Sequence, residues 1–209
     1  MPDYRIKSVH AVQVQSRRHN MAVSARVETM DGAVGKALCY AGVSVGTHEV
    51  HFQYDGGNRW GGLGCMSAVR NVNTIIADTI LGMDVRNQFE IDQAMLSIQG
   101  NGSASVGGNA IAAVSAAVLK AGAAATQMPL YRYIGGENAC MLPVPGAPAF
   151  SGGERWGGAV HTHGNKPTGA FQCFGYDSFS EASSAAWDMY HLFAKELESR
   201  DKAAVFYTT

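Results

Sequence analysis

The stretch from Asn109 to Ala125 constrains the fold of this chain more than any other, because it is an alanine-rich helical pattern with small residues on several faces. Small side chains around a helix let neighbouring elements pack closely on more than one side. We therefore predict that this segment is the central helix of its domain. Pro129 marks a position where the helix has ended, since proline cannot continue a helical hydrogen-bond ladder.

Strand patterns precede the helix. Residues 4–14 and 22–29 are rich in β-forming residues, and Asp31-Gly32 separates them from a third run at 33–40. Asp-Gly between two such runs is a strong hairpin signal, because glycine supplies the positive φ of a tight turn. The chain is thus predicted to open with an antiparallel meander of about three strands.

A glycine-dense loop at 41–64 follows the strands, and apolar residues then recur every three or four positions from Met66 to Ile80. That spacing predicts an amphipathic helix. Asp84 is predicted to cap the next helix. With strands first and helices afterwards, residues 1–138 are predicted to form one α+β domain.

The pattern changes at 139–209. A glycine-rich region with scattered histidines precedes a final helix, which Ser178 and Glu181 are predicted to begin as a capping box. The apolar residues of that helix lie on one face between Ala182 and Leu197. Nothing in this part predicts a self-contained core.

The charge of the chain excludes several functions. Charged residues make up 16% of the sequence and the net charge is −1, without any basic run. Nucleic-acid binding is therefore not expected, because it relies on clustered Lys and Arg. Neither a signal peptide nor a run of about 18 apolar residues is evident, so we expect a soluble cytoplasmic protein without a membrane span. A surface so poor in charge favours oligomers.

Metal-ligand patterns are sparse. The four cysteines have no paired spacing and are expected to be free thiols. His161 and His163 stand at i and i+2, a spacing that lets two side chains on a strand share a metal, with Glu154 as a candidate third ligand. Exposed loop histidines among glycines are the simpler interpretation of this pair.

Ordered sequence blocks resemble a known family. The chain is similar to the first half of an enolase in VETMDG (27–32), GVSVGTHE (42–49), AVRNVNTIIA (68–77), LGMDVRNQFEIDQAM (81–95), GGNAIAAVSAA (107–117), MPLYRYIGG (128–136), LPVP (142–145) and FSEA (179–182). The resemblance implies an α+β N-terminal lid domain over 1–138 and the start of a (β/α)8-type barrel over 139–209. That barrel is expected to be incomplete, because such barrels need roughly 200 residues or more.

The resemblance also implies a substrate loop. The family's loop reads roughly S-G-A-S-T-G, and its second Ser ligates Mg2+; here Gly42, Ser44 and Gly46 keep the glycines and that serine. His48 and Glu49 match the end of the family's loop. A plain loop serine is the alternative interpretation of Ser44.

Two further positions depart from the family. Its G-G-[SA]-H loop ends here in Arg155, which can pair with a phosphate or phosphonate but cannot shuttle protons at pH 7. Counting back from FSEA places Thr168 where the family has a catalytic Glu, and Thr is no general acid near neutral pH. The family's Lys base and its three metal-binding carboxylates are expected beyond Thr209, so the catalytic residues are unknown.

Three functions remain open. The first is an enolase-type lyase, with Mg2+ implied by resemblance, of which this chain is the front portion. The second is a diverged enzyme that acts on a related phosphorylated or phosphonate acid. The third is a non-catalytic interaction or regulatory protein. In each case a homo-oligomer or a partner chain is expected, because an open partial barrel exposes strand edges and the apolar face of its helix.

Overall fold

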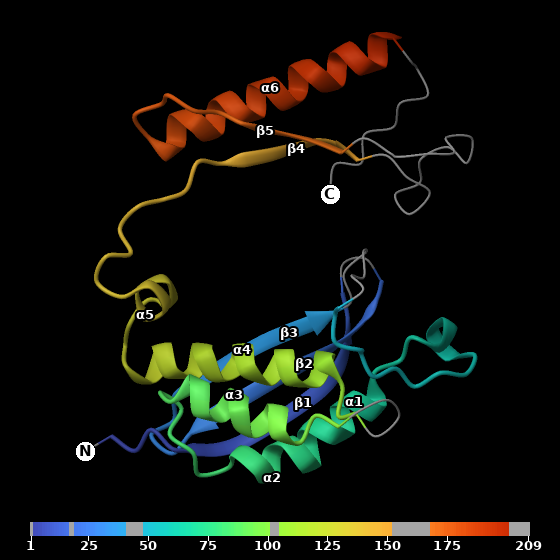
Figure 1. Cartoon of the computed structure of the whole chain (residues 1–209), viewed down its shortest axis with the longest axis vertical. Helices are drawn as coiled ribbons and strands as arrows, with labels where there is room; N and C mark the ends of the chain where they lie inside the picture. Colours follow the sequence, from blue (N-terminus) through green and yellow to red (C-terminus); the bar gives the residue numbers. More distant parts are fainter. Residues whose placement is uncertain (1, 17–18, 41–47, 101–104, 152–167, 201–209) are drawn as a thin grey trace. The chain divides into compact units, whose positions relative to one another are not determined.

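The computed structural model describes residues 2–16, 19–40, 48–100, 105–151 and 168–200. The chain divides into two compact units, Met1–Ala139 and Cys140–Thr209. Each unit is described by itself below (Figure 1).

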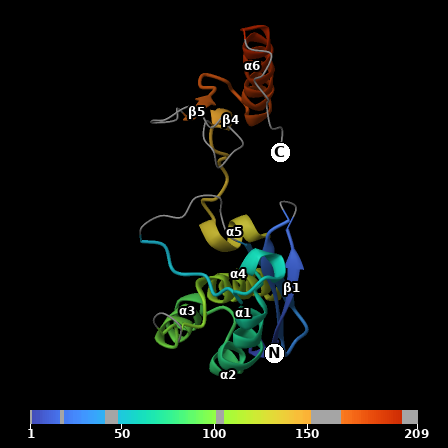
Figure 2. The same ribbon diagram turned by 90° about the vertical axis from the view of Figure 1, so that its right-hand side faces the viewer.

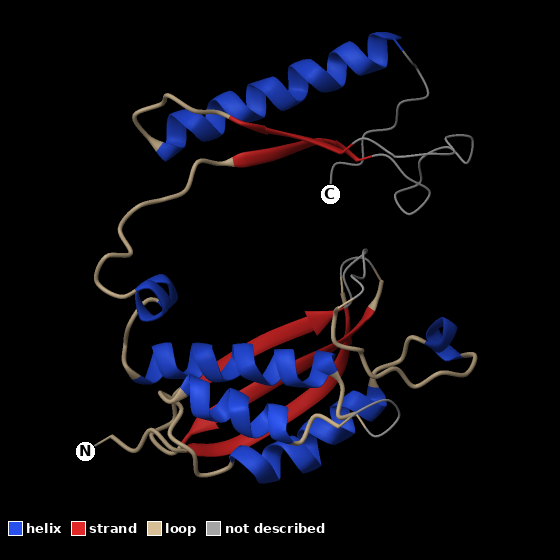
Figure 3. Cartoon of the chain, viewed as in Figure 1, coloured by secondary structure: helices blue, strands red, loops and turns tan. Residues whose placement is uncertain are grey.

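The first unit opens with an antiparallel sheet of three strands, β1 (Ile6–Gln15), β2 (Met21–Thr29) and β3 (Val34–Tyr40), in that order. Gly32, with φ of 88°, provides the turn between β2 and β3. The meander and its Asp-Gly turn are therefore confirmed (Figure 3).

Helices follow the sheet and lie on one side of it (Figure 2). The predicted helix from Met66 to Ile80 is confirmed as a continuous helical segment of α1 (Met66–Asn71), a π-helical turn η2 (Val72–Ile76) and α2 (Ala77–Ile80). The helices α3 (Gln88–Ser97), α4 (Gly108–Ala125) and α5 (Leu130–Gly135) come next, and a short 3-10 turn, η1 (Arg59–Gly62), precedes them all.

Helix α4 is the central helix of this unit, as predicted. It packs across β2 and β3 and buries the side of the helix that carries Ala110, Ala113, Val114, Ala117, Val118 and Ala121. Gly35 of β3 allows the closest approach, because a Cβ there would overlap the carbonyl oxygen of Ala117. Among the described helices α4 alone is long and apolar enough to cross a membrane, but its packing on the sheet is that of a core helix.

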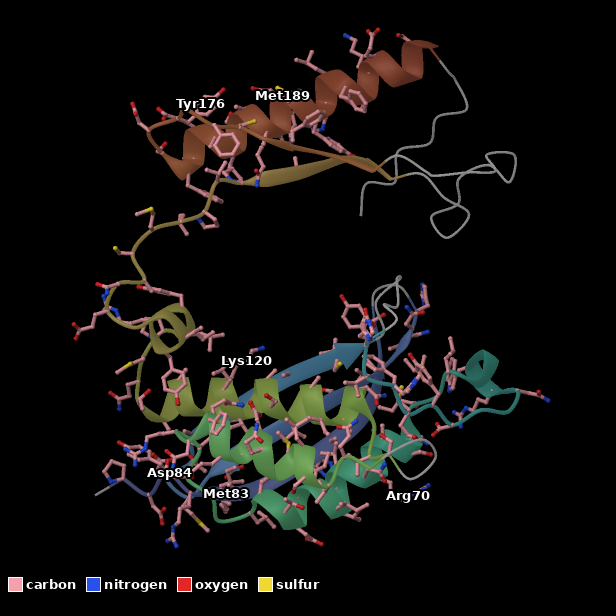
Figure 4. The ribbon with its side chains drawn as sticks, in the orientation of Figure 1. Arg70, Met83, Asp84, Lys120, Tyr176 and Met189 are labelled. Carbon is pink, nitrogen blue, oxygen red and sulfur yellow. The ribbon has the colours of Figure 1, made fainter. Side chains whose placement is uncertain are left out.

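Asp84 does not cap the second helix, so that prediction was wrong. Helix α3 begins at Gln88, and Asn87 precedes it. The carboxylate of Asp84, which is labelled in Figure 4, instead accepts hydrogen bonds from the backbone and guanidinium of Arg86. Asp84 also pairs with Arg5 in an isolated β-bridge. The Asp84 carboxylate is therefore engaged within the turn after α2 and does not reach the first N–H groups of α3.

The second unit contains an antiparallel pair, β4 (Gly146–Ser151) and β5 (Thr168–Gln172), and the helix α6 (Phe179–Arg200). The hydroxyl of Ser178 accepts a hydrogen bond from the backbone N–H of Glu181 at 3.2 Å, which is half of the predicted capping box. Neighbouring strands of a regular (β/α)8 barrel are parallel. The described part of this unit therefore does not show a barrel, and the barrel segment stays a prediction.

Candidate functional site

The described residues contain only some of the predicted site. Two exposed residues, His48 and Glu49, lie between β3 and η1. Thr168 is the first residue of β5, but its side chain is outside the description. Six other candidates lie outside the described residues: Gly42, Ser44, Gly46, Arg155, His161 and His163.

The segment that follows His48 and Glu49 is fastened to the start of α4. The side-chain carbonyl of Asn109 accepts a hydrogen bond from the backbone N–H of Gln53 at 3.1 Å, and its amide donates to the Gln53 carbonyl at 3.1 Å. The N–H of Gly108 donates to the carbonyl of His51 at 2.9 Å. Three hydrogen bonds to backbone groups of this segment therefore hold it against the start of α4.

Two glycines bring the segment close to the helix. A Cβ at Gly107 would lie 2.6 Å from the Cβ of Gln53, and one at Gly108 would lie 2.9 Å from a methyl group of Val50. Gly107 also has a φ of 95°, which favours glycine. The two glycines before Asn109 thus leave room for the segment around Val50 and Gln53 to pack against the start of α4.

Asp55 continues the anchoring at the start of α1. Its carboxylate accepts hydrogen bonds from the backbone N–H groups of Met66 at 2.8 Å and Ser67 at 2.7 Å. Burial alone would raise the pKa of Asp55, but the hydrogen bonds from Ser67 and Met66 outweigh it and hold the pKa below the ordinary 3.8. Asp55 is therefore charged at neutral pH and serves the helix as a cap supplied from a distant position.

Cys65 lies where these contacts meet. Its backbone N–H donates to the side-chain carbonyl of Gln13 at 2.6 Å, and the amide of Asn109 lies 3.8 Å from its sulfur. Burial, and next the charge of Asp55, raise the pKa of the Cys65 thiol. A buried thiol with a raised pKa is unreactive, so Cys65 contributes packing. All four cysteines are free, as predicted.

The described residues do not fit a magnesium site by themselves. No group of three or more His, Cys, Asp or Glu side chains within them could hold a metal ion. Magnesium prefers several oxygen ligands, including carboxylates. No catalytic step through a metal is therefore assigned to the described part of the chain.

The sequence interpretation missed Asn109 and Asp55 as the residues that fix the candidate segment. Their signals were present, because Asn109 follows two glycines at the start of a helix and Asp55 begins a glycine-rich turn. Neither signal names the partner, which lies 56 residues away for Asn109 and 11 residues away for Asp55.

A three-stranded meander followed by helices, with an anchored segment after the third strand, defines an α+β domain. Residues 6–134 match the N-terminal domain of enolase. The enolase of Campylobacter jejuni strain 81-176 is 40% identical over 195 residues, which are 92% of this chain and 46% of that enolase. The enolase of Methanosarcina acetivorans is 40% identical over 202 residues, 95% of this chain and 46% of that protein. The chain belongs to the enolase family, as the sequence blocks predicted, and it spans about half the length of these relatives.

Proposed function

We propose that the first unit is the lid domain of an enolase-type lyase, an enzyme that removes water from 2-phosphoglycerate to form phosphoenolpyruvate. The observation that carries the proposal is the segment after β3. The described part of this segment begins with His48 and Glu49, which match the end of the family's substrate loop in sequence. The residues that follow them are hydrogen-bonded to the start of α4. Anchored ends on a rigid helix and sheet suit a loop that covers a substrate.

In this proposal the chain covers and orients the substrate, while other residues perform the chemistry. The family uses Mg2+, and we assign the Lys base and the metal-binding carboxylates to the part of the relatives' length that this chain does not span. Ser44 would contribute one oxygen to a Mg2+ ion. Exclusion of water from a covered site would strengthen the electrostatic interactions of the bound substrate.

A split-enzyme assay tests this function. The chain, the C-terminal part of the Campylobacter jejuni enolase beyond the matched region, and their mixture are each given 2-phosphoglycerate and Mg2+, and the absorbance of the enol phosphate is followed. We expect turnover by the mixture and by neither part alone. Ser44→Ala should lower turnover in the mixture, whereas Ser97→Ala on α3 should not. A silent mixture, beside an active intact Campylobacter enolase, would contradict the proposal and favour a non-catalytic role.

Arg155 favours a second candidate function, a diverged enzyme for a related phosphonate or phosphorylated acid. Arg155 stands where the family's loop has a histidine. Arginine can bind a phosphate or phosphonate group with two parallel hydrogen bonds. Turnover of a phosphonate analogue, but not of 2-phosphoglycerate, would support this candidate.

We also propose that the chain associates with a second copy or a partner chain. In the second unit Trp187 and Leu192 of α6 are 63% and 68% exposed. In this proposal the two side chains contribute to a larger apolar surface that a partner covers. Light scattering at rising concentration checks this proposal, and a monomer throughout would contradict it.

A further inference from the structure

Asn109 makes a contact that few side chains can make. Its carboxamide meets both backbone groups of Gln53, accepting from the N–H and donating to the carbonyl, each at 3.1 Å. Asn109 is buried, with 1% of its surface exposed. The contact therefore lies inside the first unit, where an unmade hydrogen bond is costly.

The chemistry of this contact requires an amide. A carboxylate has no donor at neutral pH, so Asp at this position would place an acceptor opposite the Gln53 carbonyl and bury a charge. Alanine would leave the N–H and the carbonyl of Gln53 without these partners. Position 109 therefore needs asparagine because its side chain pairs with the backbone of Gln53, and its size alone would not be enough.

The same contact sets the position of the residues just before it. Val50 lies against Gly108, and His51 accepts the hydrogen bond of the Gly108 N–H, so the chain has one path along the start of α4. Exposed His48 and Glu49 come immediately before Val50. The backbone of His48 and Glu49 is therefore held next to an anchored residue, and neither side chain has to contact α4 for this.

We propose that Asn109 is a positioning residue for the segment that carries His48 and Glu49. The inference rests on the proposed function, which assigns this segment to the substrate-covering part of the lid. Asn109 touches neither substrate nor metal in this proposal. It acts through Gln53 and the chain that precedes Gln53.

Asn73 offers a control with the same type of contact at an exposed position, whereas Asn109 is buried. Its carboxamide pairs in the same way with the N–H and carbonyl of Ala11, at 2.7 and 3.1 Å, but Ala11 lies on β1. Asn73→Asp therefore removes the same kind of interaction from the same unit without touching Gln53. Any effect common to both variants is a general loss of stability.

The first measurement is amide hydrogen exchange in peptides that cover residues 48–55 and 6–15. Asn109→Asp should accelerate exchange in residues 48–55 by about tenfold or more, because the hydrogen bond donated to the Gln53 carbonyl is lost and a buried charged oxygen faces that carbonyl instead. Asn73→Asp should accelerate exchange in residues 6–15 and leave 48–55 within about twofold. Gly108→Ala, which presses on Val50, is the second variant if Asn109→Asp does not fold.

The second measurement is the KM for 2-phosphoglycerate in the split-enzyme mixture. Asn109→Asp should raise the KM by about tenfold, while Asn73→Asp leaves it unchanged. Unaltered exchange at 48–55, or equal acceleration by both variants, would overturn the inference. Local acceleration with an unchanged KM would overturn it too, because the contact would then be only structural. If the wild-type mixture shows no turnover, the proposed function fails instead, and the exchange comparison still decides whether Asn109 holds the segment.

Discussion

At the scale of single residues, Gly35 allows the closest approach of any glycine in the part of the chain that the structure describes. Gly35 lies directly under α4, and the carbonyl oxygen of Ala117 occupies the space of a Cβ. The central helix can approach β3 only because this position is glycine. Small residues on the helix supply the other half of the same fit.

Gly35→Ala is therefore expected to destabilise the first unit by roughly 3 kcal/mol or more, because the overlap is with backbone and the whole helix has to move. Gly32→Ala is the control. Its site is open, so only the positive φ is strained, at a cost of about 1 kcal/mol. Urea denaturation followed by circular dichroism measures both, and equal losses would contradict the close packing.

Asp55 gives a prediction with a pH dependence. Asp55→Ala should cost about 1 kcal/mol near neutral pH, as the loss of a helix cap does. The folded pKa of Asp55 is lowered below 3.8, so its stabilisation is present above that pH and disappears as the pH falls through the lowered value. The difference between wild type and Asp55→Ala in urea midpoints should thus shrink below about pH 4. A difference that stays constant with pH would show that the charge of Asp55 does not matter.

At the scale of elements, α4 explains both what the sequence could predict and what it could not. Its alanine pattern predicts a central helix because close packing on two sides needs small residues, and the Asp31-Gly32 turn predicts the meander because its geometry is local. The predicted start of α3 was wrong, because the Asp84 carboxylate accepts a hydrogen bond from the backbone of Arg86, two residues away, instead of capping the helix. The Asn109 contact could not be predicted, since its partner is fixed only once the sheet and α4 have come together.

Overfilling of α4 tests its role. Ala117→Leu adds three carbons at a fully buried position and should cost about 2–3 kcal/mol through overpacking. Lys120→Leu on the exposed side of the same helix should stay within about 0.5 kcal/mol. Thermal unfolding of the two variants makes the comparison, and similar melting temperatures would exclude α4 as the core helix.

At the scale of the whole molecule, the buried core belongs to one unit. The core cluster runs from Ile6 to Ala121, whereas the buried apolar residues described in the second unit are Ala182 and Ala186. Burial of apolar surface is the main stabilising term of a domain. The first unit therefore has the means to fold by itself, and the described part of the second has little.

Limited proteolysis should reflect this difference. Cleavage is expected first between Gly136 and Gly146, where Met141 and Leu142 are 90% and 67% exposed, and it should leave a resistant fragment that contains β1 to α5. Mass spectrometry of the fragments identifies the cut. A resistant fragment that begins after residue 140 would contradict the assignment of the core to the first unit.

The contact between Asn109 and Gln53 also imposes an order on events during synthesis. Its two residues are separated by 56 positions, so a chain emerging at 5–20 residues per second exposes Gln53 for roughly 3–11 s before Asn109 appears. During that interval the segment has no docking surface. We therefore expect this segment to settle only after α4 has formed on the sheet, late in the folding of the domain.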